Sequence, residues 1–258
     1  MINQLKKIIP SKIKQKIKLF LHKGNSYLCP FCGYSSKDLA PIGYDFPVII
    51  EKQVIGAGKR DAGCYKCGSI DRERLVYIYL KHIMKIFNNK GKQLKILHFA
   101  PEKNLSKTIL DFGFNDYTCG DLFTEGYSYP NSVKNINVLN ISYNEKTFDL
   151  IICNHILEHI PNDIDAMKEL FRVLKNGGKA ILQVPISKNT DKTFEDFSIT
   201  EPNQREIVFG QFDHIRIYGQ DYSKRLSSVG FSVERFNFSG EYSQYGFNED
   251  EDIFIAKK

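Results

Sequence analysis

The chain has 258 residues, of which 42% are hydrophobic and 26% are charged. These proportions are those of an ordinary globular protein, and they exclude a disordered chain, a collagen-like chain and a coiled-coil rod. The sequence has no run of about 18 apolar residues, which excludes a transmembrane helix, and no apolar segment with a cleavage site near its start, which argues against secretion. The length predicts one or two domains with a sizeable core.

The net charge of +6 is concentrated at the start of the chain. Residues 1–25 contain seven lysines and no acid, so the rest of the chain is nearly neutral. Apolar residues recur there at three- and four-residue steps, which predicts a basic amphipathic helix within residues 1–24, broken or kinked near Pro10. Such a helix is typical of binding to a membrane surface or of docking on a partner, here through residues 2–21. The alternative is a helix that packs its apolar face on the protein itself.

Four of the six cysteines form two C-x-x-C pairs, each followed by a glycine. The pairs are Cys29 with Cys32 and Cys64 with Cys67. Two such turns supply the four tetrahedral thiolates of a structural zinc site, so we predict a small zinc ribbon over residues 25–70. Two disulfides or four free thiols are the alternatives, and a reducing compartment disfavours the disulfides. Cys119 and Cys153 lie in apolar segments and are predicted to be buried packing residues.

From residue 71 onward, predicted helices and strands alternate. We predict helices over residues 71–87, 103–112, 162–175 and 220–229, the third capped by residues 176–178, and strands over residues 94–99, 117–120, 136–139, 148–153, 179–184, 231–236 and 253–256. This alternation is typical of βαβ units around a mostly parallel sheet. The last strands follow one another without a helix, which indicates one antiparallel strand at the end. Residues 71–258 are therefore predicted to be an α/β domain.

Ligands of open parallel sheets bind beyond the carboxyl ends of the strands, so the residues after each predicted strand are candidates. They are His98, Phe99, Ala100, Pro101 and Glu102 after the first strand, Asp121 after the second, Asn140 and Ile141 after the third, and Asn154 and His155 after the fourth. Asp121 lies about twenty residues beyond Ala100, where an acid can accept hydrogen bonds from both ribose hydroxyls of a nucleotide. A turn or helix cap is the alternative role for Asp121.

Two segments resemble a known family. Residues 148–161, FDLIICNHILEHIP, resemble the fourth-strand motif of the class I S-adenosylmethionine-dependent methyltransferases, and residues 169–178, ELFRVLKNGG, are similar to the helix and Gly-Gly turn that follow it. The resemblance covers about residues 92–258. It implies a Rossmann-like sheet, mostly parallel with an antiparallel last strand, and S-adenosylmethionine as the cofactor.

The loop after the first strand departs from the family's Gly-rich pattern. It reads HFAPE over residues 98–102, a form that resembles a bacterial subgroup of these methyltransferases. The resemblance implies that Glu102 binds the ammonium group of the cofactor, directly or through water. It places Leu122 on the adenine ring and Asn140 within hydrogen-bonding reach of it. It also places His98, Phe99, Ala100, Ile141, Asn154 and His155 in the cofactor site.

Methyl transfer to a hydroxyl requires alignment of two substrates and a base that takes the proton. His155 directly follows the fourth strand and should face the pocket mouth. The segment 209–219 holds Asp213, His214 and Arg216. An imidazole beside a guanidinium stays neutral, which suits His214 as a base, and Arg216 could hold a carboxylate or phosphate of the acceptor. A structural polar cluster is the alternative. The polar segment 185–206 is predicted to be a long loop, either a lid, an acceptor site or a solvated connection.

We therefore expect a cytoplasmic methyltransferase with a structural Zn²⁺, attached peripherally to the inner membrane face through residues 2–21. The expected acceptor is a small molecule or a glycan- or lipid-linked molecule that is methylated on oxygen. One alternative is a catalytically inactive, methyltransferase-like scaffold, and another is an RNA or protein methyltransferase. The nearly neutral body argues against nucleic acid as a partner. The sequence carries no signal for the oligomeric state.

Overall fold

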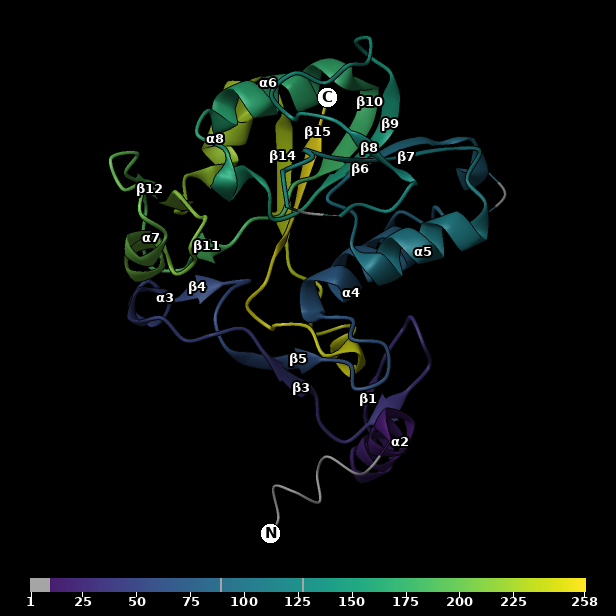
Figure 1. Cartoon of the computed structure of the whole chain (residues 1–258). Helices are drawn as coiled ribbons and strands as arrows, with labels where there is room; N and C mark the ends of the chain where they lie inside the picture. The colour runs from purple at the N-terminus through teal and green to yellow at the C-terminus, as the bar shows by residue number, and fades with distance from the viewer. Residues whose placement is uncertain (1–9, 89, 127) are drawn as a thin grey trace.

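A seven-stranded sheet forms the centre of the computed structural model, which describes residues 10–88, 90–126 and 128–258 (Figure 1). Its strands are β6 (Lys95–Phe99), β7 (Asp116–Asp121), β8 (Val133–Asn135), β9 (Phe148–Cys153), β10 (Leu174–Ile181), β14 (Ser232–Phe236) and β15 (Ile253–Lys257). They lie in the order β14-β15-β10-β9-β6-β7-β8. The pairings from β10 through β8 are parallel, whereas β15 runs antiparallel to both β10 and β14. The predicted α/β sheet is confirmed.

Helices cover both faces of this sheet (Figure 1). On one face lie α4 (Asp71–Ile78), the π-helical turn η1 (Tyr79–Ile83) and α5 (Lys103–Phe112), and on the other lie α6 (Asp163–Val173) and α8 (Tyr222–Ser228). In β9, Leu150 and Ile152 pack toward α4 and α5, whereas Ile151 and Cys153 pack toward α6 and α8. Successive strand residues point to opposite faces, so a strand buried on both sides is apolar throughout.

Three predicted elements differ from the structure. The third strand is β8, Val133–Asn135, and residues 136–139 instead form a turn that Asn137 and Asn140 bridge. The helix predicted over 162–175 ends at Val173, and β10 begins at once, so residues 176–178 interrupt the pairing of β10 with β9 rather than cap the helix. The helix predicted over 71–87 leaves α-helical geometry after Ile78.

The ribbon segment, residues 25–70, carries short paired elements and packs against a distant part of the chain. Its elements are β1 (Lys23–Leu28) paired with β2 (Ser35–Ser36), β3 (Ala40–Ile42) paired with β5 (Arg60–Gly63), and between them α3 (Pro47–Glu51) and β4 (Val54–Ile55). Strand β4 pairs with β11 (Ile186–Ser187), and Ile49 and Val54 pack on Phe209 of α7 (Pro202–Phe209). The segment 185–206 is thus not an irregular loop, since it also contains β12 (Phe194–Glu195), paired with β13 (Arg216–Ile217).

Buried charges of α4 join the ribbon segment to the sheet domain. Arg74, 1% exposed, donates hydrogen bonds to the carbonyls of Ser69 and Ala62 on one side and of Tyr245 and Gly246 on the other. Asp71 binds Arg60 of β5. Glu73 accepts hydrogen bonds from the first backbone amides of α5, Asn104 N and Leu105 N, at 2.6 and 2.8 Å. Helix α4 therefore positions both its neighbours.

The basic helix at the start of the chain is α2 (Ser11–Leu21), which Pro10 precedes. The predicted apolar positions before Pro10 lie outside the described residues. Within α2, Ile13, Ile17, Phe20 and Leu21 are exposed, so the alternative in which this face packs on the protein is not what the structure shows. The helix contacts the ribbon segment through polar groups, such as the hydroxyl of Tyr34 on the carbonyl of Leu19. Within the described ranges, every helix is too short or too polar to cross a bilayer.

Candidate functional site

Two strained turns lie side by side at the carboxyl edge of the sheet. Strands β6 and β9 are neighbours in register, with Phe99 opposite Cys153. The backbone bends sharply after each strand: Ala100, directly after β6, has φ +42°, and His155, two residues beyond the end of β9, has φ +53°. Residues other than glycine rarely adopt this left-handed region, and such strain persists mainly at functional sites.

A chain of hydrogen bonds runs along this edge and forms the candidate cofactor site. His98 bonds the hydroxyl of Tyr117 through Nδ1 and the carboxylate of Glu102 through Nε2, both at 2.8 Å. Glu102 also accepts from Asn154 Nδ2 at 3.2 Å, and Asn154 Oδ1 is buried without a partner among the described residues. Burial raises the pKa of Glu102, but the hydrogen bond and charge of His98 outweigh it and hold that pKa below its usual value.

The other predicted cofactor residues are arranged along the same edge with different exposure. Asp121 ends β7 and is half-buried, and burial raises the pKa of its carboxyl. Leu122 is 51% exposed, as expected of a residue that could cover a ligand. Asn140 is exposed and Ile141 is buried in the core, and neither follows a strand directly because β8 ends at Asn135. Their roles in cofactor binding stay predictions.

A cavity of about 560 Å³ opens beside the end of β9. Its walls come from residues 42–72, residues 155–185 and residues 206–217. The ribbon segment passes close over the site, since a Cβ built on Gly56 would lie 3.4 Å from Cε1 of His155. The ribbon segment therefore forms one wall of the cavity, with apolar side chains such as Phe46 and the cation Arg60, and Arg72 at the start of α4 adds a second cation.

A buried carboxylate among imidazoles forms the opposite wall. Glu158 in the 3-10 turn η3 (Leu157–His159) is 1% exposed. Its Oε1 lies 3.5 Å from Nδ1 of His155 and 4.0 Å from Nε2 of both His159 and His214. Burial lowers the pKa of His214 to about 4, and burial together with the charge of Arg72 lowers the pKa of His155, so both imidazoles are neutral near pH 7.

The two other predicted catalytic residues are committed to contacts within the protein. Asp213 accepts a hydrogen bond from Gln211 and lies 3.3 Å from Nδ1 of His159. Burial raises the pKa of Asp213, but His159 outweighs it and lowers that pKa to about 2. Arg216 is buried, and its donors bind Glu195 and three backbone carbonyls of residues 157–161. Holding an acceptor anion would require Arg216 to exchange these bonds, and its catalytic role stays a prediction.

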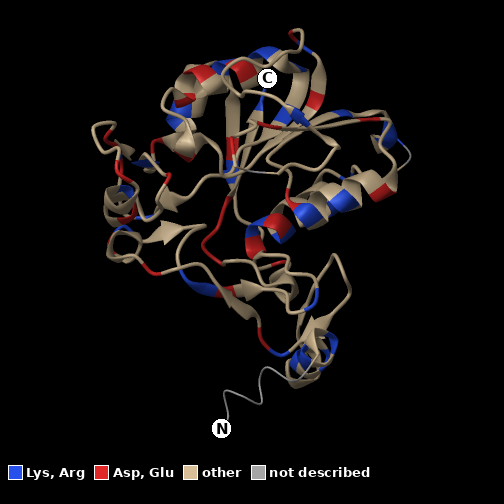
Figure 2. Ribbon diagram, viewed as in Figure 1, with Lys and Arg blue, Asp and Glu red and all other residues tan. Residues whose placement is uncertain are grey.

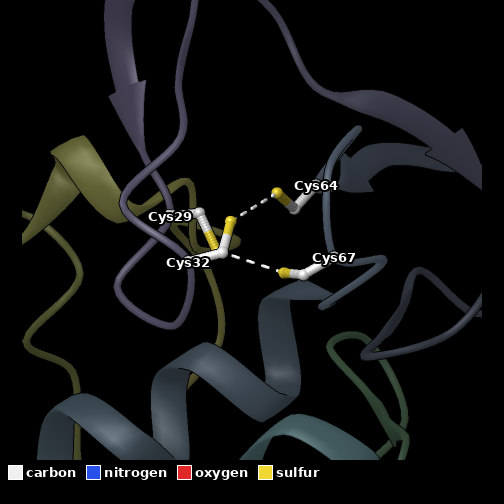
Figure 3. A group of neighbouring side chains, drawn as sticks. All are labelled: Cys29, Cys32, Cys64 and Cys67. Atoms are coloured by element: carbon white, nitrogen blue, oxygen red, sulfur yellow. Dashed lines mark hydrogen bonds between the residues drawn. The ribbon is translucent and has the colours of Figure 1, made fainter. Parts of the chain in front are cut away.

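The four predicted metal-binding cysteines meet at one point (Figure 3). Cys29 Sγ lies 3.5 Å from Cys67 Sγ, and Cys32 Sγ lies 3.7 Å from Cys64 Sγ. These separations exceed a disulfide bond of about 2.05 Å and match the roughly 3.8 Å edge of a tetrahedron with Zn–S bonds of about 2.3 Å. The donor set therefore fits Zn²⁺.

Both C-x-x-C turns have the same backbone geometry. The amide of Gly33 donates to the carbonyl of Cys29, and the amide of Gly68 donates to that of Cys64, each at 2.9 Å. Both glycines have left-handed φ values, +67° and +74°, which a residue with a side chain rarely adopts. The repeated glycine in the sequence thus has a conformational cause.

Comparisons with known proteins agree with this architecture. Residues 111–182 match the family model of a methyltransferase domain. A demethylmenaquinone methyltransferase of Alkalihalophilus pseudofirmus is 28% identical over 87 residues, 31% of this chain and 37% of that protein. An uncharacterized protein of Methanocaldococcus jannaschii is 39% identical over 66 residues, 24% of this chain and 28% of that protein. The matches thus span less than two fifths of either curated relative.

Among solved structures, the cyclase SpnF superposes with a TM-score of 0.50 at 13% identity, over 72% of this chain and 81% of that chain. This likeness concerns the fold. Together with the strand order, it confirms the predicted Rossmann-like sheet, and the family model matches residues 111–182 to a methyltransferase domain. Membership of the subgroup with the HFAPE loop and the zinc ribbon stays a prediction.

The sequence interpretation missed two groups in the cavity wall. Glu158 was part of the recognised motif but was not assigned to the site. Arg72 lines the cavity, and its Nε is buried without a partner in the described part of the chain. Its signal in the sequence was weak, because it belongs to the charged run Asp71–Arg74, which resembles a solvated helix start.

The Glu102 carboxylate gives a pH-dependent test of the hydrogen-bond chain. A depressed pKa stabilises the fold above the unfolded-state pKa of about 4.3, and this stabilisation is lost as the pH falls below it. We expect Glu102→Gln to lower the free energy of unfolding by about 1 kcal/mol at neutral pH and to have little effect at roughly pH 3, measured by urea unfolding. Glu145→Gln, on the surface, serves as the control. An equal loss at both pH values would contradict the arrangement.

Proposed function

We propose that this protein is an S-adenosylmethionine-dependent methyltransferase that methylates an oxygen of a small molecule or of a glycan- or lipid-linked acceptor. The observation that carries the proposal is the cavity beside β9, which lies next to the candidate cofactor site and is lined by neutral imidazoles. The activity and the acceptor are proposed for the whole chain, because the curated relatives match only part of it.

The residues at the strand ends suit the cofactor. Asn154 Oδ1 is an orphaned buried acceptor, and together with Glu102 it could receive the ammonium group of S-adenosylmethionine. The carboxylate of Asp121 has no side-chain partner within the described ranges, so it is free to accept from the two ribose hydroxyls.

When bound, the cofactor supplies an electrophilic methyl group on a sulfonium. The residues of this chain then have to align the acceptor oxygen, exclude water and accept one proton. The two candidates for the proton acceptor are His155, whose Nε2 is buried without a partner among the described residues, and His214. Asp213 holds the neighbouring His159, and Arg216 fixes the turn that carries Glu158.

The cavity walls favour an acceptor with an apolar body and an anionic or strongly polar group. The apolar part of the wall includes Ile49, Phe46 and Phe209. The polar group would face Arg72, whose Nε is buried without a partner in the described part of the chain, unlike Arg60, which binds Asp71. An anion that accepts a hydrogen bond from this Nε would satisfy a buried donor whose desolvation is otherwise costly.

Calorimetric titration with S-adenosylmethionine and S-adenosylhomocysteine tests the cofactor. We expect binding by the wild type and at least a tenfold loss of affinity in Asp121→Ala, because two hydrogen bonds worth about 1 kcal/mol each disappear. Asp111→Ala, an exposed residue of α5, should bind like the wild type. Folded wild-type protein that binds neither compound would contradict the proposal and favour the binding or scaffold alternative.

We further assign Zn²⁺ to the four cysteines of the ribbon segment. A closed site with four thiolates leaves no position for a substrate and is structural. Elemental analysis of the purified protein should show that Cys32→Ser loses one zinc equivalent relative to the wild type. Cys119→Ser, a buried cysteine of β7, should lose none. Retention of the full zinc content by Cys32→Ser would contradict the assignment.

Helix α2 is proposed to bind an anionic membrane surface. Its exposed apolar residues Ile13, Ile17, Phe20 and Leu21 recur at helical spacing, and lysines lie on the remaining surface of the helix. Figure 2 shows these lysines gathered at the end of the molecule far from the sheet. An exposed apolar stripe flanked by lysines binds lipid by burying apolar area and by attraction to anionic head groups.

Vesicle co-sedimentation with the full chain tests this surface. We expect binding to vesicles of phosphatidylcholine with phosphatidylglycerol, weaker binding to phosphatidylcholine alone, and loss of binding at high salt. Phe20→Ser should reduce binding roughly tenfold, since a buried Phe side chain contributes about 1.5–3 kcal/mol. Leu110→Ser, an exposed apolar residue of α5, is the matched control. Equal binding of both variants would overturn the assignment to α2.

A further inference from the structure

Glu158 is a buried carboxylate without a hydrogen bond to either oxygen among the described residues. Isolated buried charges are strongly unfavourable, so they are paired, hydrogen-bonded or bound to a metal ion. The groups nearest to Oε1 are imidazole nitrogens at 3.5 to 4.0 Å, which is too long for a good hydrogen bond. A cation shared by these groups would satisfy the carboxylate and the imidazole lone pairs together.

The orientation of His159 shows which of its ring nitrogens is available as a ligand. Its Nδ1 lies 3.3 Å from both the carboxylate and the backbone carbonyl of Asp213. Both are acceptors, so Nδ1 carries the proton. In the neutral ring, Nε2 then presents a lone pair toward Glu158. A second proton on Nε2 would not bridge the 4.0 Å gap. A histidine held by a carboxylate through one nitrogen, with the other directed into a cluster, is the usual arrangement of a metal ligand.

His214 completes the cluster from another part of the chain. Its Nε2 lies 4.0 Å from Glu158 Oε1, and one ligand atom from each of Glu158, His159 and His214 lies within 4.8 Å of the others. Ligands on a tetrahedral ion with bonds of about 2.05 Å are roughly 3.3 Å apart. The ligand atoms would thus have to approach one another by about 0.7 to 1.5 Å, a movement within rotamer adjustment.

We propose that Glu158, His159 and His214 bind a divalent transition-metal ion that keeps an open coordination position toward the cavity. Two imidazoles and one carboxylate suit ions such as Zn²⁺, Fe²⁺ or Mn²⁺, and three protein ligands with an open fourth position are typical of catalytic rather than structural sites. This site differs from the cysteine cluster in its ligands, in its place in the fold and in its access to the cavity.

The ion would bind the acceptor oxygen and lower the pKa of its hydroxyl, as metal ions do for bound water. His214 is then a ligand rather than a base, and His155 is left to accept the proton through its unpartnered Nε2. The acceptor would be a molecule that ligates the metal through the oxygen to be methylated. This role rests on the proposed methyl transfer, whereas the metal site does not.

Cobalt titration of the zinc-loaded full chain, after brief treatment with a mild chelator, tests the site. We expect one equivalent of Co²⁺ to bind with d–d absorption but without a sulfur-to-cobalt charge-transfer band, since the ligands are nitrogen and oxygen. Thermal unfolding should shift upward as Co²⁺ is added, because the ion binds only the folded state. A charge-transfer band at the first equivalent would place the ion at the cysteines and overturn the proposal.

Variants separate this site from nonspecific binding. Glu158→Gln and His214→Asn should each lose at least a hundredfold in Co²⁺ affinity, and Asp213→Asn about tenfold through its support of His159. Glu158→Gln should also lose the upward shift of thermal unfolding on addition of Co²⁺, because it lacks the carboxylate ligand. His82→Asn, a half-buried histidine outside the site, is the matched control. If Glu158→Gln fails to fold, the loss of Co²⁺ affinity in His214→Asn still tests the site.

Titration with S-adenosylmethionine in parallel distinguishes the two proposals. Cofactor binding without Co²⁺ binding would overturn the metal site and leave the methyltransferase proposal in place. Co²⁺ binding that depends on Glu158, without cofactor binding, would support the metal site and contradict methyl transfer. Co²⁺ binding that is equal in the wild type, Glu158→Gln and His214→Asn would overturn the metal site.

Discussion

The buried charges of helix α4 are the constraint on which the rest of the structure depends. Four consecutive charged residues, Asp71 to Arg74, start this helix, and three of them are fully buried. Each contacts a different part of the chain: Asp71 binds Arg60 of β5, Glu73 accepts from the first amides of α5, and Arg74 donates to the backbone carbonyls of two distant segments. Removing one partner would leave an uncompensated buried group. These contacts therefore hold the ribbon segment, the start of α5 and the sheet in one arrangement.

That arrangement explains why the cavity has walls from three parts of the chain. The parallel pairing of β6 with β9 brings two strained turns together, and the sheet alone would leave the end of β9 open to solvent. The ribbon segment, held by α4 and by the pairing of β4 with β11, covers it from one side. The residues of α7 and β13 cover it from the other. Water exclusion around His155 and Glu158 is thus a property of the whole chain.

The sequence predicted the elements whose signals are local. The strand β9 and the helix α5, which ends just before Gly113, were predicted with the residues that the structure shows. A continuous apolar run indicates a doubly buried strand, and an amphipathic helix has a strong 3.6-residue periodicity. The cysteine cluster followed from spacing alone. The strand β8 was misplaced because Ile136 and Val138 are buried in a turn, and burial without strand geometry gives the same apolar pattern.

Contacts between distant segments had no signal in the sequence. The pairing of β4 with β11 joins two-residue strands, too short for any alternation to be visible. Helix α7 has weak amphipathicity, and its burial depends on Ile49 from the ribbon segment. The burial of the charged run at the start of α4 had no signal in the sequence, because charges are seldom fully buried unless paired, and their partners lie up to 172 residues away. The cavity wall could therefore not be assembled from motifs.

The same separation along the chain determines when the cavity can form during synthesis. The ribbon segment leaves the ribosome first, but its apolar residues Ile49 and Val54 find their partners only after Phe209 and Ile217 have been made. The hydrogen bonds of Arg74 are completed later still, because two of its carbonyl acceptors belong to Tyr245 and Gly246. A nascent chain therefore carries an unfinished, partly apolar surface until residues 209–246 have been translated. Chains of this kind expose aggregation-prone surface in proportion to that delay.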